Sequence, residues 1–287
     1  MRVRNEFGVF RFQKHQNDLE KYGLSGQVKC ITTKKYNNNK FVEGEYDWKH
    51  IMEFNEIGNV IEEKEITPSR CKQKIHRRIY RYNGKNFKTE RIEIFADGAK
   101  VVESYQYDAY GNLREVHYSE QEADLERGQE FFEPELMDIA EIDREVLHYE
   151  DQNRVVEIDA YVGSKLGRKT LIAYNDKTLE TMESQYQLGT SPALYRQYYF
   201  IYNDRGYKIY DELLDGQGAV VIYSKYKYNK HGDMVYSYSN DIPEAIESTK
   251  VFEYQYDYDK KQNWLRRYLL KEGSLVMDGS REISYYG

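Results

Sequence analysis

The chain alternates apolar and polar residues with a period of two over most of its length. The clearest apolar series are Phe252, Tyr254, Tyr256 and Tyr258; Tyr46, Trp48, His50, Met52 and Phe54; and Met234, Tyr236 and Tyr238. Side chains alternate in this way between the two faces of a β-strand, whereas a helix needs a spacing of three or four. The pattern therefore predicts short β-strands throughout.

A second pattern divides the strands into repeats. An aromatic residue is followed by Asn or Asp (by Glu after Tyr149), then by two or three polar residues and a Gly or Asn. We call the aromatic residue of each copy the anchor, and the anchors are Phe54, Tyr82, Tyr107, Tyr149, Tyr174, Tyr202, Tyr228 and Tyr258. They recur at intervals of about 26 residues, apart from one longer interval between Tyr107 and Tyr149, and Tyr36 begins a degenerate earlier copy.

Each anchor is predicted to enter a hairpin turn. Asn and Asp bond to their own backbone, and Gly adopts positive φ at little cost. The turn residues that we predict are Phe54, Gly58, Asn59, Tyr107, Gly111, Asn112, Tyr202, Gly206, Tyr228, Gly232 and Tyr258. A second class of turn follows most anchors by roughly half a repeat. It is predicted at Pro68, Asp97-Gly98, Gly163, Gly189, Asp215-Gly216, Asp241 and Glu272-Gly273.

These repeats predict an all-β fold, an antiparallel meander of about 16 or more short strands. Open sheets rarely exceed about 10 strands without curling, so we expect a curled repeat sheet, shell-like or solenoid-like, in preference to a propeller. Residues 1–30 are predicted to form an N-terminal cap segment with a short helix at Asn17–Gly23, and residues 31–287 a single repeat domain. An acidic insertion at about 120–146 is expected to be strand-poor and to hold a helix at PELMDIAEI, and DIPEAIES is expected to form one helical turn.

Composition narrows the classes of partner. The chain has 30 tyrosines and a net charge of -7, with both signs interspersed, so nucleic acid is not an expected partner. No stretch reaches the roughly 20 apolar residues of a membrane-spanning helix, and no signal peptide is evident. The compartment is therefore unknown, either cytoplasmic or exported with the leader absent. Cys30 and Cys71 are either free or joined in one disulfide.

No pattern of catalytic, cofactor-binding or metal-ligating residues is evident. The six histidines show no metal-ligand spacing. Gly216-Gln217-Gly218 precedes a strand where a dinucleotide site needs a helix, and Asp257, Asp259 and Asn263 lack the rest of a calcium loop. We therefore expect a protein that is not an enzyme and that uses no cofactor and no metal.

Several copies of the repeat resemble a known family. YDAYGNLREVHY and YNDRGYKIYDELLDGQG resemble the YD repeats of the Rhs/teneurin class, as well as shorter bacterial hairpin-repeat proteins of unknown function. DLEKYGLSGQVKCITTKKY resembles the segment that opens such short proteins. The resemblance extends from about residue 18 to the end and implies a curled β-array, which in the large Rhs members is a shell enclosing a toxin. This chain is shorter and lacks their self-cleavage signature and toxin domain.

The abundance of tyrosine suggests a binding role. Aromatic residues are enriched at protein interfaces, although they also stack across strands to stabilise a sheet. We expect a non-enzymatic binding or scaffold protein that presents a Tyr-rich surface to a protein partner. The candidate surface residues are Trp48, Trp264, Tyr236 and Tyr254. The alternatives are a carbohydrate-binding protein of the cell envelope and an immunity-type protein that neutralises a toxin.

Overall fold

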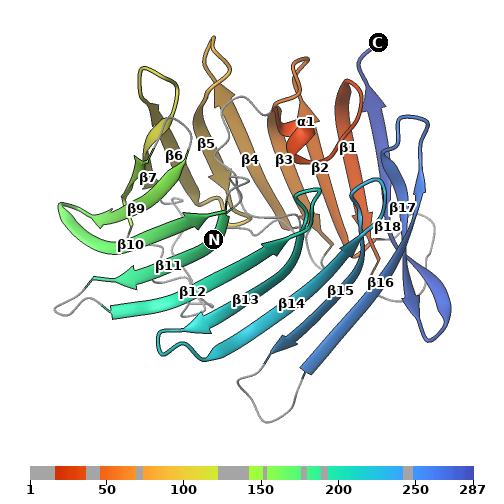
Figure 1. Cartoon of the computed structure of the whole chain (residues 1–287). Coiled ribbons are helices and arrows are strands. Elements are labelled where there is room, and N and C mark those ends of the chain that lie inside the picture. Colours follow the sequence, from red (N-terminus) through yellow and green to blue (C-terminus); the bar gives the residue numbers. More distant parts are fainter. Residues whose placement is uncertain are drawn as a thin grey trace. The chain divides into compact units, whose positions relative to one another are not determined.

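A computed structural model describes residues 17–36, 46–68, 74–121, 142–150, 154–175, 180–188, 193–241 and 248–287. These residues form 18 β-strands and one four-residue helix, α1, at Asp18–Lys21 (Figure 1). The chain divides into two compact units. We call residues 15–103, 120–125 and 252–287 the N/C-terminal unit. Residues 1–14, 104–119 and 126–251 are the central unit.

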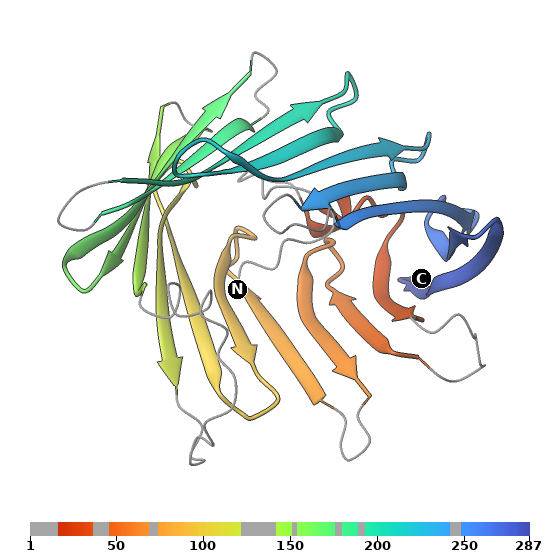
Figure 2. The same cartoon turned by 90° about the horizontal axis from the view of Figure 1, so that it is seen from below.

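The N/C-terminal unit contains the strands of both chain ends. They are β1 (Val28–Lys35), β2 (Trp48–Phe54), β3 (Val60–Thr67), β4 (Lys74–Tyr82), β5 (Lys88–Ile94), β17 (Trp264–Lys271) and β18 (Ser274–Tyr285). Three strands have residues in both units, namely β6 (Lys100–Tyr107), β7 (Leu113–Gln121) and β16 (Ser248–Tyr258). Strand β1 pairs antiparallel with both β2 and β18, so the first and last strands of the chain are neighbours within this unit (Figure 2).

The central unit continues the same antiparallel order. Its strands are β7 (Leu113–Gln121), β8 (Arg144–Tyr149), β9 (Val155–Val162), β10 (Lys165–Tyr174), β11 (Glu180–Gln187), β12 (Ala193–Tyr202), β13 (Lys208–Asp215), β14 (Val220–Tyr228) and β15 (Met234–Asp241). Each pairs with the next along the chain. The prediction of an all-β antiparallel meander is confirmed.

Five of the turns that follow an anchor and lie within the described residues share one geometry. In the Asp108 turn, the carboxylate accepts the backbone N–H groups of Tyr110 and Asn112 at 2.9 and 2.8 Å. Gly111 then adopts a φ of 84°, a left-handed angle that glycine tolerates best. Asn83, Asn203, Asn229 and Asp259 accept the equivalent pairs of N–H groups. The turn is therefore specified locally by its own sequence.

The predicted turn residues lie in these turns. Anchors Phe54, Tyr107, Tyr202, Tyr228 and Tyr258 each end a strand. Gly58, Gly111, Gly206 and Gly232 all have positive φ, and Asn59 and Asn112 are buried at the following position. In the last copy, Gln262 adopts a φ of 67° in place of a glycine.

Anchor tyrosines also connect successive repeats. The Tyr228 hydroxyl donates to the carbonyl of Lys208, six residues after the preceding anchor, at 2.8 Å. The same bond joins Tyr82 to Val60, Tyr149 to Leu113 and Tyr174 to Val155, at 2.7 to 2.8 Å. Each of these four anchors thus fixes the start of a neighbouring strand through a hydroxyl group that phenylalanine lacks.

Each unit has its own apolar core. In the N/C-terminal unit, Leu19 of α1 packs with a cluster of buried side chains, Leu24, Val28, Ile31, Met52, Phe54 and Val60. Asn17 caps α1 as predicted, accepting the Glu20 N–H at 3.0 Å. The core of the central unit consists of Leu113, Val116, Leu147, Val155 and Ile158.

Several predictions fall on or near residues outside the described ranges. Of the predicted insertion, Glu120 and Gln121 belong to β7 and Arg144–Val146 to β8, so its ends are strand. PELMDIAEI, the turn at Gly189, most of DIPEAIES, most of the copy beginning at Tyr36, and Cys71 lie outside the described residues. Cys30 is half-buried and is not in a disulfide. The division into a cap and a single repeat domain stays a prediction.

Candidate functional site

Three tyrosines from three successive strands stack on one face of the central unit. The ring centroids of Tyr210 on β13 and Tyr223 on β14 are 6.4 Å apart, and those of Tyr223 and Tyr238 on β15 are 5.7 Å apart. The hydroxyl groups of Tyr223 and Tyr238 lie 3.2 Å apart, within hydrogen-bond distance. All three rings are half-buried. They form a continuous aromatic strip across the sheet.

Two lysines of β14 lie on the same face. Lys225 pairs in register with Tyr210 and Tyr238, and Lys227 pairs with Tyr236, so their side chains project together. The Lys225 Nζ atom is 5.6 Å from the centroid of the Tyr223 ring, and that of Lys227 is 5.0 Å from the Tyr236 ring. We call Tyr210, Tyr223, Lys225, Lys227, Tyr236 and Tyr238 the tyrosine face.

The Tyr210 hydroxyl of this face is held in its neutral, proton-donating form. Burial, together with a hydrogen bond to Glu212 at 2.5 Å, raises the pKa of Tyr210 to about 12. Its hydroxyl therefore keeps its proton at neutral pH. The face combines rigid rings, neutral hydroxyls and two cations, which suits binding rather than proton transfer.

The four predicted surface residues have different environments. Tyr236 belongs to the tyrosine face. Tyr254 is half-buried, with Phe252 stacked on it and the Arg267 guanidinium 4.9 Å from its centroid. Trp48 is half-buried between His50, 5.3 Å away, and the Lys35 ammonium, 5.2 Å away.

Trp264 does not fit the prediction of a surface binding residue. Its side chain is only 6% exposed. The Arg281 guanidinium lies 3.7 Å from its ring centroid, and Tyr256 meets it edge-on at 6.0 Å. Arg281 belongs to β18. It covers Trp264 because of how β17 and β18 pair, and the alternation of residues along β17 does not reveal that pairing.

A network of buried charges lies in the N/C-terminal unit. Arg78 on β4 is 2.7 Å from the Glu65 carboxylate, 3.1 Å from that of Glu93 and 3.3 Å from that of Glu63. His50 and Tyr80 also contact Glu63, and His76 contacts Glu93. The network spans β2 to β5, and its charges compensate one another.

Two carboxylates of this network, those of Glu63 and Glu93, are held in the ionised state. Burial by itself would raise the pKa of Glu63, but the hydrogen bond from His50 and the contacts with Tyr80 and Arg78 outweigh it and lower the pKa to about 2. The pKa of Glu93 is likewise lowered to about 2, against the effect of burial, by His76, Arg91 and Arg78. Carboxylates that are ionised at neutral pH cannot act as general acids there.

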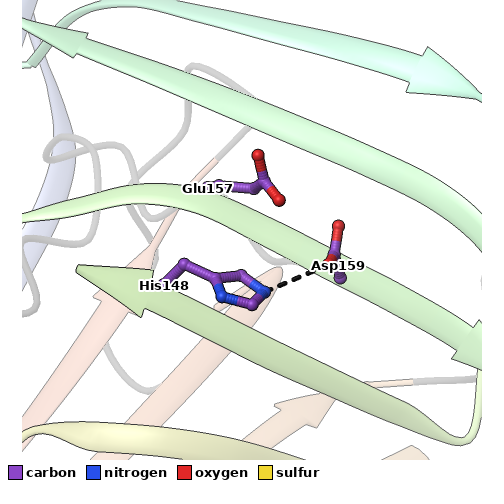
Figure 3. Close-up of side chains that lie close together, drawn as sticks. All are labelled: His148, Glu157 and Asp159. Atoms are coloured by element: carbon purple, nitrogen blue, oxygen red, sulfur yellow. Dashed lines mark hydrogen bonds and ion pairs between the residues drawn. The ribbon is translucent and has the colours of Figure 1, made fainter. Parts of the chain in front are cut away.

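A smaller charged cluster lies in the central unit. His148 on β8 and Glu157 and Asp159 on β9 bring their side chains together (Figure 3). The Nε2 atom of His148 lies 3.0 Å from Oδ2 of Asp159. Lys169 on β10 contacts both carboxylates, at 2.5 Å from Glu157 and 3.5 Å from Asp159. Strand register puts this cluster on the same face as the tyrosine face.

Sequence reasoning missed both charged clusters. Their shared signal is a pair of polar residues two positions apart on one strand, such as Glu63 with Glu65, His76 with Arg78, and Glu157 with Asp159. These pairs become recognisable only when the turn positions are used to align neighbouring strands. The pairing of β8 with β9, for example, places His148 opposite Glu157.

Comparison with known proteins gives structural neighbours only. No family model matches the chain, and no curated protein matches it. The Photorhabdus luminescens Tc holotoxin pore carrying a TccC3 mutation aligns with a TM-score of 0.35 and 10% identity, over 81% of this chain and 11% of that chain. The TcdB2–TccC3 complex aligns with a TM-score of 0.35 and 10% identity, over 80% of this chain and 12% of that one. The chain thus spans about a tenth of the length of these toxin chains.

A porin-like protein from Bacteroides uniformis aligns with a TM-score of 0.40 and 8% identity, over 91% of this chain and 99% of that one. Within the described part of the chain, no helix is both long enough and apolar enough to span a membrane.

Proposed function

We propose that this chain is a non-enzymatic binding or scaffold protein and that the tyrosine face contacts a protein partner. The observation that supports this most strongly is the stack of Tyr210, Tyr223 and Tyr238 across three strands. These rings are fixed by stacking and by the hydroxyl contact between Tyr223 and Tyr238. Binding therefore orders few additional side chains, which lowers its entropic cost.

The chemistry of the face defines the kind of partner surface. Tyrosine is enriched among the residues that contribute most to interface energies. Lys225 and Lys227 add two positive charges beside the rings. A complementary surface would carry carboxylates next to apolar or aromatic side chains.

Site-specific photo-crosslinking tests this proposal. A benzophenone amino acid replaces Tyr223 in the full chain. The substituted chain is expressed in the cells from which the protein comes, and the cells are then irradiated. Tyr226 is the matched control, because it lies on the same strand but on the opposite face, where its hydroxyl donates to Asp211 at 3.1 Å. We expect one protein to cross-link at position 223 and not at 226.

The captured protein is then purified, and its affinity for the unmodified chain is measured. Tyr223→Ala should weaken binding by at least about tenfold, as expected for a central aromatic residue of an interface. Equal cross-linking from both positions, or unchanged affinity for Tyr223→Ala, would contradict the proposal.

The two alternatives stay as secondary proposals. For carbohydrate binding, the half-buried Trp48 is the better of the two predicted tryptophans, because Trp264 is buried. A glycan array with wild-type and Trp48→Ala protein distinguishes this function, since only a signal that the substitution removes would support it. An immunity-type role predicts that the captured partner is a toxin.

Three further predictions from the sequence also stay proposals. The first is that the chain is a short member of the YD-repeat proteins, and the second is that its strands form a curled, shell-like or solenoid-like sheet. The third is that the protein is located in the cytoplasm or, after export, outside it. Small-angle X-ray scattering tests the curling, because a flat sheet of this size would have a distinctly larger maximum dimension.

A further inference from the structure

We propose that His148, Glu157 and Asp159 form a binding site for a divalent transition-metal ion of the zinc type, and that Lys169 occupies this position when the metal is absent. The site is independent of the proposed protein partner, because its ligands lie on β8 and β9 and the tyrosine face lies on β13 to β15.

The ligand atoms already converge. One nitrogen of His148 and one oxygen each of Glu157 and Asp159 all lie within 4.8 Å of one another. Their separation in a tetrahedral zinc site is about 3.4 Å, as follows from bond lengths near 2.0 to 2.2 Å. His148 Nε2 and Asp159 Oδ2 are nearly there, at 3.0 Å. Small rotations of the Glu157 side chain would complete the set.

The environment of Asp159 also favours a cation at this position. Its side chain is only 9% exposed. Its Oδ1 atom is buried and accepts no hydrogen bond, and the Lys169 ammonium is 3.5 Å away. A buried carboxylate oxygen without a hydrogen bond is costly, so this atom is poised to accept a stronger electrostatic partner.

The donor set selects the class of metal. One imidazole nitrogen with two carboxylate oxygens suits zinc and its neighbours in the transition series, whereas calcium and magnesium prefer oxygen ligands alone. Two carboxylates and a neutral imidazole balance the charge of a divalent ion. His148 must present an unprotonated Nε2, so a proton on that atom moves to Nδ1 or is released to solvent. A fourth position stays open to water.

Lys169 can leave the site at little cost. Its side chain is 31% exposed and interacts with the carboxylates through one ammonium group on a flexible stem. On metal binding, the ammonium would move into solvent, and a divalent charge would take its place. The affinity for metal is therefore set by competition between Lys169 and the ion.

Isothermal titration calorimetry with zinc chloride tests this proposal on the full chain. The test variants are His148→Ala, Asp159→Asn and Lys169→Met. His117→Ala is the matched control, since His117 also contacts a carboxylate, that of Glu115, at 3.0 Å on the adjoining strand β7 but has no second acidic ligand in the cluster. Circular dichroism melting confirms that each variant is folded.

We expect zinc to bind wild-type protein and His117→Ala equally. Loss of a ligand in His148→Ala or Asp159→Asn should weaken binding by at least about tenfold, and Lys169→Met should strengthen it by at least about tenfold. Zinc X-ray absorption should show one imidazole among oxygen ligands. Equal affinity of wild type, His148→Ala and Asp159→Asn would overturn the proposal, as would a failure of Lys169→Met to bind zinc.

Discussion

In the N/C-terminal unit, Arg78 holds Glu63 and Glu93 beside two histidines, and in the central unit Lys169 holds Glu157 and Asp159 beside one. Both clusters use the same residue types on adjacent antiparallel strands. They differ in burial and in the cation. The Arg78 side chain is 8% exposed and contacts three carboxylates, whereas Lys169 is 31% exposed and leaves Asp159 Oδ1 without a hydrogen bond.

This difference follows from the shapes of the two cations. A guanidinium group has five N–H donors in a rigid plane and can serve several carboxylates at once. An ammonium group is a point charge on a flexible chain. We therefore expect the carboxylates around Arg78 to stay paired with the protein's own cation. The carboxylates around Lys169 are expected to exchange the ammonium group for a metal ion.

The largest effect should come from removing the arginine. Arg78→Met removes the guanidinium that Glu63, Glu65 and Glu93 share, and although Arg91 still contacts Glu93, the loss of a buried charge partner for Glu63 should cost about 3–5 kcal/mol of unfolding free energy. Arg77→Met is the control, because Arg77 is 44% exposed and pairs with Glu62 on the other face, so its loss should cost about 1 kcal/mol or less. Urea unfolding measures both, and equal losses would refute the contrast between the two faces.

The second-largest effect should come from lowering the pH, which removes the contribution of the arginine network to stability. The pKa of Glu63 is about 2 in the folded protein and near 4.5 in its ordinary state, so its contribution is complete above pH 4.5 and is lost as the pH falls through 2. This shift corresponds to about 3 kcal/mol, and the effect of Glu93 overlaps because both carboxylates share Arg78. The urea concentration at the midpoint of unfolding should therefore decrease as the pH is lowered from 5 to 2.5. An NMR titration of the Glu63 carboxyl carbon with a midpoint near 4.5 would exclude this cause.

A smaller effect is expected from removing the lysine. Lys169→Met should lower the unfolding free energy by about 1 kcal/mol or less when metal is chelated, because the ion pairs are partly exposed. Added zinc should more than restore it, since a ligand that binds only the folded state stabilises that state. Thermal melts with chelator and with zinc measure the two changes. A loss as large as that of Arg78→Met would show that the two clusters do not differ as described.

The smallest effect should come from the turns, which are alike in both units. Gln262 has a φ of 67° where the turns of Gly58, Gly111, Gly206 and Gly232 have glycine and the turn after Tyr82 has Asn86. Gln262→Gly should therefore stabilise the protein by about 0.5–1 kcal/mol. Gly232→Ala is the opposite control, because its φ is 91° and a Cβ atom there would collide with the Tyr207 hydroxyl. If Gln262→Gly were less stable than wild type, the contacts of the Gln262 side chain would stabilise the protein more than the release of backbone strain does.

The strands and turns could be predicted from the sequence because their causes are local. Alternation reports the two faces of a strand, and Asn55, Asp108 or Asn229 bonds to the backbone of its own turn. The charged clusters depend on which residues meet across strands, and the burial of Trp264 depends on Arg281 of the following strand. The bulge that shifts register between Asp257 and Tyr258 adds to this difficulty, because alternation alone does not count the extra residue.

The difference between the two cations is tested most directly by zinc calorimetry of Lys169→Arg. An arginine there should engage Glu157 and Asp159 together, as Arg78 engages its carboxylates, and zinc affinity should fall by at least about tenfold relative to wild type, with no loss of thermal stability. Zinc affinity equal to that of wild-type protein would contradict the claim that the cation decides whether such a cluster is open or closed.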